Sequence, residues 1–284
     1  MRADKFQGKV VLITGAAGGL GAALCRRYVA AGAHVVAMDI HAGQLVALQA
    51  ALQADMSGDM DRPQASRLFT IGGSTAGNIA DPAACAAAVA QTVDHFGALD
   101  VLINNAGISH RSLLQLTDPD VIRRVMEVNF FGALQMTHAA LPHLIQSRGT
   151  VAAVSSVAGF APLYGRTGYA ASKHALHGFF NSLRTEVAPQ GVKVSLVCPS
   201  FIATGIGRAA MGGQGGATLA PRVTAGGESR PDDIALRIFS AIAQGKDLLL
   251  PDTTSRLAWW VNKLAPDFYA RTMTRRVSAE FAPH

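Results

Sequence analysis

Long apolar runs are missing from this chain of 284 residues. No uninterrupted apolar stretch approaches the ~18 residues that a membrane-spanning helix requires, and the polar N-terminal segment lacks the apolar core of a secretion signal. The sequence therefore predicts a cytoplasmic protein. Low-complexity runs are missing too, and hydrophobic residues make up 49% of the chain. A globular protein with a large buried core is expected.

Cysteines are few, and their number is odd. Cys25, Cys85 and Cys198 lie far apart, and none has a histidine or a second cysteine at the spacing of metal ligands. Disulfides, zinc and other metal centres are therefore not expected. The sequence predicts that all three are small buried core residues. The histidines form no metal-like cluster with acidic residues, so surface or hydrogen-bonded structural positions are favoured for them: His110, His138, His143, His174 and His177. His110 is the one to watch, because it follows the strand end at Asn104 to Gly107.

Charged residues are sparse as well, at 15% of the chain. The net charge of +6 is compatible with anionic partners. However, lysines and arginines are scattered along the sequence rather than clustered with aromatic side chains that stack on bases. A nucleic acid partner is therefore not expected.

A glycine-rich turn follows the first predicted strand. Residues 9–14 form a β-branched run without period-two alternation, which is typical of a parallel strand buried on both faces. The segment from Thr14 to Gly21 then leads into a helix predicted over 22–31. This order favours a phosphate-binding turn, because glycines let the backbone approach a pyrophosphate and the helix N-terminus stabilises its charge.

Asp39 ends the second predicted strand, residues 34–38, eighteen residues after Gly21. An acidic side chain at this place accepts hydrogen bonds from the ribose hydroxyls of an adenosine. A carboxylate repels a 2′-phosphate, and positions 16–18 carry no lysine or arginine to bind one. NAD is therefore favoured over NADP. The alternative interpretation is that Asp39 caps the next helix, predicted over 42–54.

Strands and helices alternate through the rest of the chain. Helices are predicted over 118–145, 168–188 and 232–243, and another begins near Asp81 and Pro82; strands are predicted over 68–71, 99–103, 151–155, 193–197 and 248–250. The alternation predicts an α/β fold with a single Rossmann-like, doubly wound parallel sheet of about seven strands and helices on both faces. Residues 55–66 are interpreted as a surface excursion, and the glycine-rich stretch 72–77 has no assignment.

Tyr169 and Lys173 stand four residues apart in a predicted helix, which places them on one face. The pKa of a free phenol is about 10, too high for release of its proton near neutral pH. A neighbouring cation favours the phenolate. The pair is therefore a candidate for proton transfer, although the same spacing is common on helix surfaces.

Five motifs in one order give that pair its context. They are TGxxxGxG at Thr14 to Gly21, NNAG at Asn104 to Gly107, Asn129, Ser156, and Tyr169 with Lys173. Over about residues 6–250 the chain resembles the short-chain dehydrogenase/reductases. The resemblance implies an oxidoreductase that moves a hydride between a nicotinamide dinucleotide and a secondary alcohol or ketone.

The resemblance also implies a role for each site residue. Tyr169 is the general acid/base, Ser156 holds the substrate oxygen, Lys173 lowers the phenol pKa and grips the nicotinamide ribose, and Asn129 orders a water. Ser155, one residue earlier on its strand, is expected to point away. Implied cofactor contacts are Gly15, Gly18, Gly19, Leu20, Gly21, Asp39, Asn78, Ile79, Asn105, Ala106, Gly107, Tyr169, Lys173, Pro199, Ile202 and Thr204.

Two positions depart from the family pattern. Ser200 follows Pro199 where a glycine is usual, and Asn78 stands where an acid commonly contacts adenine. Both bear on cofactor affinity rather than on the tetrad. A catalytically silent dinucleotide-binding regulator or scaffold is the alternative function, against which the complete tetrad argues. Epimerase or dehydratase chemistry on nucleotide sugars would require a TGxxGxxG turn and a larger C-terminal domain.

The chain continues past the family pattern, which sets residues 1–251 apart as a catalytic domain and 252–284 as a helical extension. Apolar residues recur in the extension at helical spacing, and a second helical piece begins at Pro266. The apolar residues are Leu257, Trp260, Val261, Leu264 and Phe268. The basic residues that flank them are Arg256, Lys263, Arg271, Arg275 and Arg276. Three interpretations stand: packing on the domain or a sister subunit, a roof over an apolar pocket, and attachment to a membrane surface.

Two further expectations concern the substrate and the assembly. The glycine-rich segment 205–227 is interpreted as a mobile lid over an apolar or bulky substrate. The resemblance implies a homodimer or homotetramer, with subunit contacts through the helices predicted over 118–145 and 168–188.

Overall fold

The computed structural model describes residues 3–54, 67–207, 209–218 and 227–281. Seven strands form one parallel sheet in the order β3-β2-β1-β4-β5-β6-β7. Their bounds are β1 Val10–Thr14, β2 His34–Asp39, β3 Leu68–Gly72, β4 Val101–Asn104, β5 Thr150–Val154, β6 Lys193–Val197 and β7 Leu248–Leu249. The predicted fold class is therefore correct, and each predicted strand is present.

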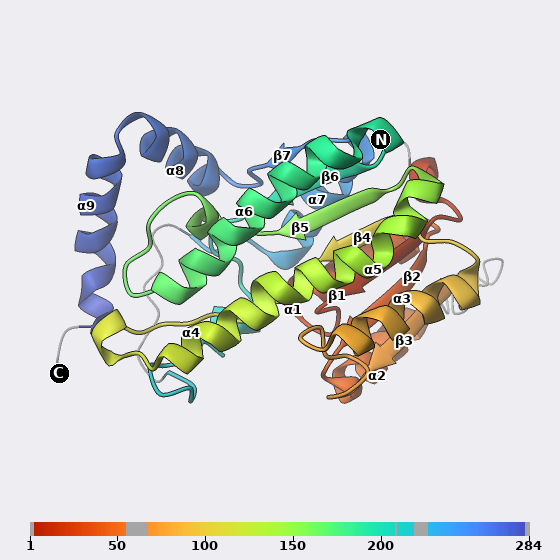
Figure 1. The fold of residues 1–284 in the computed structure, drawn as a ribbon, viewed down its shortest axis with the longest axis horizontal. Coiled ribbons are helices and arrows are strands. Elements are labelled where there is room, and N and C mark those ends of the chain that lie inside the picture. Colours follow the sequence, from red (N-terminus) through yellow and green to blue (C-terminus); the bar gives the residue numbers. More distant parts are fainter. Residues whose placement is uncertain (1–2, 55–66, 208, 219–226, 282–284) are drawn as a thin grey trace.

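The helices form a layer on each face of the sheet (Figure 1). One layer contains α1 Gly19–Ala30, α2 Ala42–Ala54 and α7 Pro231–Gln244, and the other contains α3 Pro82–Phe96, α5 Gly132–Ser147 and α6 Thr167–Val187. Successive β1 side chains enter opposite cores: Val11 and Ile13 pack in the first, Leu12 in the second. Burial on both faces explains why this strand has no polar alternation.

The sheet has a switch point between β1 and β4. The chain runs outward through β1, β2 and β3 and then crosses back to β4 on the other side of β1. Ligands of doubly wound folds bind beyond the carboxyl ends of strands at such a point. The motifs ending in Gly21 and Gly107 follow β1 and β4, so both lie at this edge.

A π turn interrupts the long helix predicted over 118–145. The structure has α4 Pro119–Met126, a π turn Glu127–Phe131 and then α5. The helical stretch was predicted correctly, but the π turn was not. It contains Asn129, and single π turns inside helices are frequent at functional sites.

Three loop assignments can now be compared with the structure. Asp81 accepts a hydrogen bond from the Ala83 amide and caps α3, as predicted. In the unassigned stretch 72–77, a Cβ on Gly77 would lie 2.0 Å from the Asp39 carbonyl oxygen, so this turn packs on the end of β2. The surface excursion 55–66 and part of the predicted lid 205–227, namely residues 208 and 219–226, fall outside the described residues.

The C-terminal extension forms two helices, α8 Thr253–Leu264 and α9 Pro266–Val277, at one end of the long axis (Figure 1). Both predicted helical pieces are therefore present. Ala258 and Tyr269 form a small core with Ala161, which joins the extension to the segment that follows β5. In the part of the chain that the structure describes, no helix combines the length and apolarity needed to cross a bilayer.

Candidate active site

A large cavity lies beyond the carboxyl ends of the strands. Its volume is about 1220 Å³, above the roughly 300–1,000 Å³ typical of ligand pockets. Every residue predicted to contact the cofactor lines this cavity except Gly21. Side chains from α8 and α9 line the same cavity, among them Leu257, Val261, Phe268 and Met273. The cavity therefore combines the predicted dinucleotide site with a wall formed by the C-terminal extension.

The glycine turn after β1 is packed too closely for larger residues. Gly19 has a positive φ of 52°, and a Cβ there would lie 2.7 Å from the Thr204 methyl group; a Cβ on Gly21 would lie 2.0 Å from the Gly15 carbonyl oxygen. Gly21 thus shapes the turn from behind. The first turn of α1 carries no acidic side chain and Gly18 caps it without a side-chain bond, so its amides suit an anionic phosphate.

The end of β4 is joined to the same turn by hydrogen bonds. The Thr14 hydroxyl accepts from the amides of Asn105 and Ala106, both at 3.1 Å, and the Asn105 side-chain amide donates to the carbonyls of Thr14 and Gly15 at 3.0 Å. These bonds hold the two strand ends together at the switch point. The Asn105 side chain therefore acts on the shape of the cofactor site.

Asp39 lines the cavity at the end of β2 and is 8% exposed. One carboxylate oxygen accepts from the Ala17 amide at 3.0 Å; the other accepts from the His41 amide and lies 2.9 Å from the His41 ring. These partners precede the first residue of α2, so the structure does not use Asp39 as the cap of that helix. The carboxylate is instead fixed beside the glycine turn.

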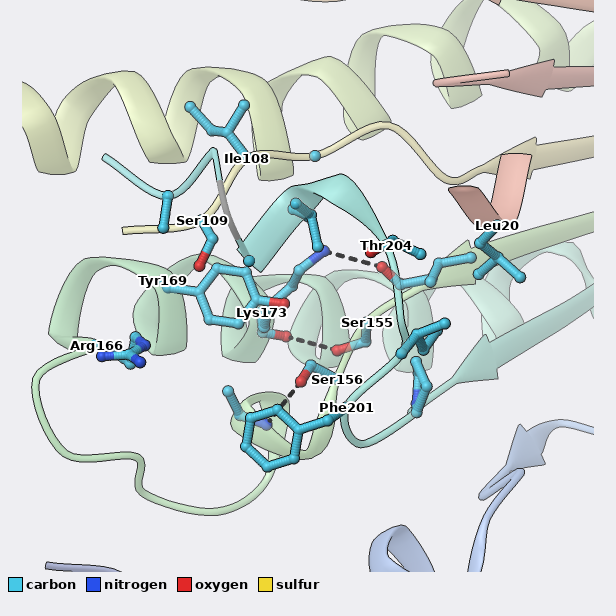
Figure 2. Close-up of a pocket in the computed structure, with 18 of the residues that line it drawn as sticks. Leu20, Ile108, Ser109, Ser155, Ser156, Arg166, Tyr169, Lys173, Phe201 and Thr204 are labelled. Carbon is cyan, nitrogen blue, oxygen red and sulfur yellow. Dashed lines mark hydrogen bonds between the residues drawn. The ribbon is translucent and has the colours of Figure 1, made fainter. Parts of the chain in front are cut away.

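Lys173 is buried against Tyr169 (Figure 2). Its Nζ lies 5.7 Å from the centroid of the Tyr169 ring and donates a hydrogen bond of 2.9 Å to the Val154 carbonyl. Burial lowers the pKa of Lys173 from its ordinary 10.5 to about 8. The lysine is therefore a cation that exchanges its proton more readily than an exposed lysine does.

Ser156 is the N-cap of the 3-10 turn Val157–Gly159. Its hydroxyl oxygen accepts from the Ala158 amide at 3.2 Å, and its proton remains available to a ligand oxygen. Figure 2 draws Ser156 among the residues that line the cavity, together with Tyr169 and Lys173. This arrangement gives the cavity a second hydroxyl donor beside the phenol.

Asn129 does not line the cavity, because its side chain is buried in the π turn at 1% exposure. Its amide group accepts from the Ile108 amide at 2.8 Å and donates to the Ile108 carbonyl and the Ser172 hydroxyl. It therefore joins the loop after β4 to α6, the helix of Tyr169. The water-ordering role stays a prediction.

Three polar residues behind Lys173 were not predicted as a group. The Ser155 hydroxyl donates to the Lys173 carbonyl at 3.4 Å and lies 3.1 Å from the His177 ring, which also lies 3.4 Å from the Cys198 sulfur. Burial lowers the pKa of His177 to about 4 and raises that of Cys198 to about 12. A neutral group thus braces α6 against the strand ends, and all three cysteines are free and buried, as predicted.

His110 and Ser200 have structural places. His110 is fully buried and lies 3.2 Å from the Thr117 hydroxyl; burial lowers its pKa. Ser200, where the family pattern has glycine, has no positive φ, so a side chain fits without strain. Its amide donates to Asp252, the N-cap of α8, at 3.0 Å. This departure thus coincides with an attachment point of the C-terminal extension.

Four arginines that line the cavity were missed by the sequence reasoning. Arg111, Arg124, Arg166 and Arg276 line the cavity. Arg166, three residues before Tyr169, forms an ion pair of 2.9 Å with the buried Glu280. No local pattern marked these residues, because each is brought to the cavity by a different loop or helix.

Comparison with known proteins is consistent with this geometry. The family model described as short chain dehydrogenase matches residues 9–213. The bovine protein "Dehydrogenase/reductase SDR family member 7B" is 39% identical over 274 residues, which cover 95% of this chain and 82% of that protein. The Anopheles gambiae "Dehydrogenase/reductase SDR family protein 7-like" is 36% identical over 283 residues, covering 96% and 84%.

Solved structures share the fold. A short chain dehydrogenase/reductase from Burkholderia phymatum in complex with NAD has a TM-score of 0.76 and 24% identity, covering 92% of this chain and 96% of that one. A short chain dehydrogenase from Burkholderia cenocepacia J2315 in complex with NADP has a TM-score of 0.74 and 24% identity, covering 96% and 99%. Together with the family model, which spans more than half of the chain, these findings show that the protein belongs to the short-chain dehydrogenase/reductase family of oxidoreductases.

Proposed function

We propose that this oxidoreductase uses NAD(H) to interconvert a secondary alcohol and a ketone on an apolar or bulky substrate. The observation that carries the proposal is the buried Lys173 beside the Tyr169 ring, with Ser156 lining the same cavity. A cation held beside a phenol and a second hydroxyl donor are what proton transfer to or from a carbinol oxygen requires.

The chain's own residues handle the proton and the substrate oxygen. Ser156 donates its free hydroxyl hydrogen to that oxygen, and Tyr169 gives up or takes the proton. Lys173 stabilises the phenolate, and its hydrogen bond to Val154 keeps the ammonium in place. Asn129 positions the loop after β4 relative to α6 through Ile108 and Ser172.

The residues at the other end of the cavity fit a nicotinamide dinucleotide. The fit rests on the glycine turn, where a Cβ on Gly19 or Gly21 would meet atoms closer than 3.0 Å, and on the uncapped N-terminus of α1. The glycine turn would hold the pyrophosphate, Asp39 the adenosine ribose, and Lys173 the nicotinamide ribose. When bound, the nicotinamide supplies or accepts the hydride. The solved relatives in complex with NAD and with NADP support this cofactor class.

NAD is proposed over NADP because of Asp39. Its carboxylate is fixed by Ala17 and His41 at the rim of the cavity, so it cannot turn away from a 2′-phosphate without breaking these bonds. We expect a higher kcat/KM with NAD, and we expect Asp39→Ala to narrow the preference. Equal kcat/KM for NAD and NADP in the wild type would show that the Asp39 carboxylate does not discriminate between the two cofactors.

An apolar or bulky substrate is proposed from the remaining wall of the cavity. The side chains at this end come from three separate segments and are mainly aliphatic or aromatic: Leu163, Phe201, Ile206, Leu257, Val261, Phe268, Met273. A panel of aliphatic, aromatic, steroid and acyl ketones and alcohols, followed by the absorbance of the reduced nicotinamide, identifies the class and the cofactor.

Tyr169→Phe tests the chemistry. It removes only the proton-transferring oxygen, so turnover should be lost while cofactor binding, measured by titration, stays nearly unchanged. Tyr164→Phe is the matched control, since Tyr164 lies five residues earlier, packs against Phe281 and does not line the cavity. Retention of more than roughly a tenth of the wild-type kcat in Tyr169→Phe contradicts the role, given that general acid/base catalysis contributes about 10²–10⁴-fold.

A further inference from the structure

Large apolar side chains are exposed together on α8 and α9. Leu257 is 63% exposed, Trp260 57%, Leu264 77% and Phe268 63%, and the four lie within one stretch of twelve residues. Single exposed apolar residues are ordinary, but a contiguous group marks a surface that is covered by something else. We call these four residues the apolar stripe.

The apolar stripe has cations on one side and the cavity on the other. At 3.6 residues per turn, Leu257, Trp260 and Leu264 share one face of α8, opposite the buried Ser255 and Ala258. Around the helix, the exposed Arg256 and Lys263 lie next to this face on one side, and the cavity-lining Val261 lies next to it on the other side.

The same order is repeated on α9. Phe268 lies on its helix between the exposed Arg271 and Arg275 and the cavity-lining Thr272. Leu257 and Phe268 line the cavity and are also exposed, so they stand at its rim. Across both helices the sequence of features is therefore cations, apolar stripe, cavity opening.

We propose that this surface, the apolar stripe with Arg256, Lys263, Arg271 and Arg275, docks on an anionic lipid bilayer and turns the opening of the cavity toward the lipid. Helices with Trp, Leu and Phe on one face and flanking Lys or Arg lie in the plane of the membrane interface. Among the described residues, the helix pair forms one end of the long axis of the molecule (Figure 1).

Charge selects the bilayer as the occupant. None of the four cations forms an ion pair with another residue described by the structure. A second copy of the chain in a twofold contact would bring the same cations face to face, whereas anionic headgroups attract them. Docking does not depend on the reaction, so its failure would leave the proposed function untouched.

The test measures binding of the full-length protein to vesicles. We expect it to float with phosphatidylglycerol vesicles, to float at least tenfold less with phosphatidylcholine vesicles, and to be released by salt. Leu264→Ser combined with Lys263→Glu should weaken flotation at least tenfold. The tryptophan fluorescence of a Trp259→Phe variant, which then comes from Trp260 alone, should shift to shorter wavelength on binding.

A matched control makes the same chemical changes elsewhere. Val46→Ser combined with Lys193→Glu alters a residue that is 66% exposed on α2 and an exposed lysine at the start of β6, both outside the helix pair. This variant should float like the wild type. Three results would each overturn the proposal. The first is that the wild type does not float, and the second is that both double variants lose flotation equally. The third is a lower solution mass of Leu264→Ser with Lys263→Glu, which would mark a subunit interface.

Discussion

Replacing Lys173 with methionine should make the protein more stable while removing its activity. The lysine is 4% exposed, and burial lowers its pKa from 10.5 to about 8. At pH 7 the folded protein therefore holds the proton of Lys173 less tightly than the unfolded chain does. At about 1.4 kcal/mol for each tenfold difference in proton affinity, the buried cation costs the folded state about 3 kcal/mol.

The methionine variant loses one interaction in return. The bond from Nζ to the Val154 carbonyl disappears, which costs about 1 kcal/mol. The net gain of about 2 kcal/mol corresponds to a rise in Tm of roughly 4–8 °C for a domain of this size. Methionine fills a similar volume, so the core around α6 should keep its packing.

The pH dependence separates this effect from a change in packing. As pH rises from 8 to 10.5, the folded wild-type protein loses the proton before the unfolded chain does, so its stability rises relative to that of the variant. Thermal unfolding of both proteins between pH 7 and pH 10.5 should show the advantage of methionine falling through zero, since the cost of the buried cation disappears over this range while the lost hydrogen bond remains. Lys193→Met, at an exposed position, is the control. A variant that is less stable at pH 7, or an advantage independent of pH, would refute the reasoning.

Two further predictions concern the ends of α6 and the assembly. Glu280→Gln should lower the free energy of unfolding by about 3 kcal/mol, because breaking a buried ion pair leaves the charge of its partner, here Arg166, with less compensation. Urea unfolding midpoints measure the loss, and the exposed Glu186→Gln is the control. A loss of stability no larger than in the control contradicts the prediction. If the long helices form the subunit contact, Phe131→Glu should dissociate the dimer, since Phe131 is 38% exposed and stands beside Phe130. Sedimentation equilibrium measures the mass of the particle in solution, and a mass unchanged from the wild type excludes this interface.

The strands were predictable because a doubly buried parallel strand has a local signature. Val10–Thr14 and Lys193–Val197 were found from short runs of β-branched and aliphatic residues. The strand predicted over 99–103 begins two residues later in the structure, at Val101. Leu99 is buried as a strand residue would be, so burial and apolarity alone misplace the start of this strand. The Asp100 carboxylate accepts from the Val10 amide and pairs with Lys9, so the ladder with β1 starts at Val101.

The π turn had no such signature. The residues Glu127–Phe131 read as ordinary helix, and only the bonds from Asn129 to Ile108 and Ser172 show why the helix widens there. These partners lie 21 and 43 residues away in the sequence. Tertiary hydrogen bonds therefore decide the local geometry, and spacing within the helix cannot report them.

Candidate site residues could be predicted where they belong to a sequence motif. Isolated residues that only the fold brings to the cavity could not be predicted. Tyr169, Lys173, Ser156 and the glycine turn were named from their order and spacing, and the structure brings them to one cavity. Arg111 and Arg166 reach the same cavity from separate segments, and neither has a neighbour in the sequence that marks it. The helical spacing of the C-terminal extension predicted two helices but not the surface on which they pack.

The position of that extension follows from a fixed point at each end. At its start, one oxygen of Asp252 accepts from the Ser255 amide at 2.7 Å and begins α8, while the other accepts from the Ser200 amide, which ties α8 to the segment that leaves β6. At its far end, Glu280 binds Arg166 at the beginning of α6. Ser200 and Arg166 line the cavity, and side chains of the helix pair between these fixed points, among them Leu257 and Phe268, line it as well. Trp260 and Leu264 are exposed between these two bound ends, so the apolar surface belongs to a segment that is attached to the domain at both ends rather than to a free tail.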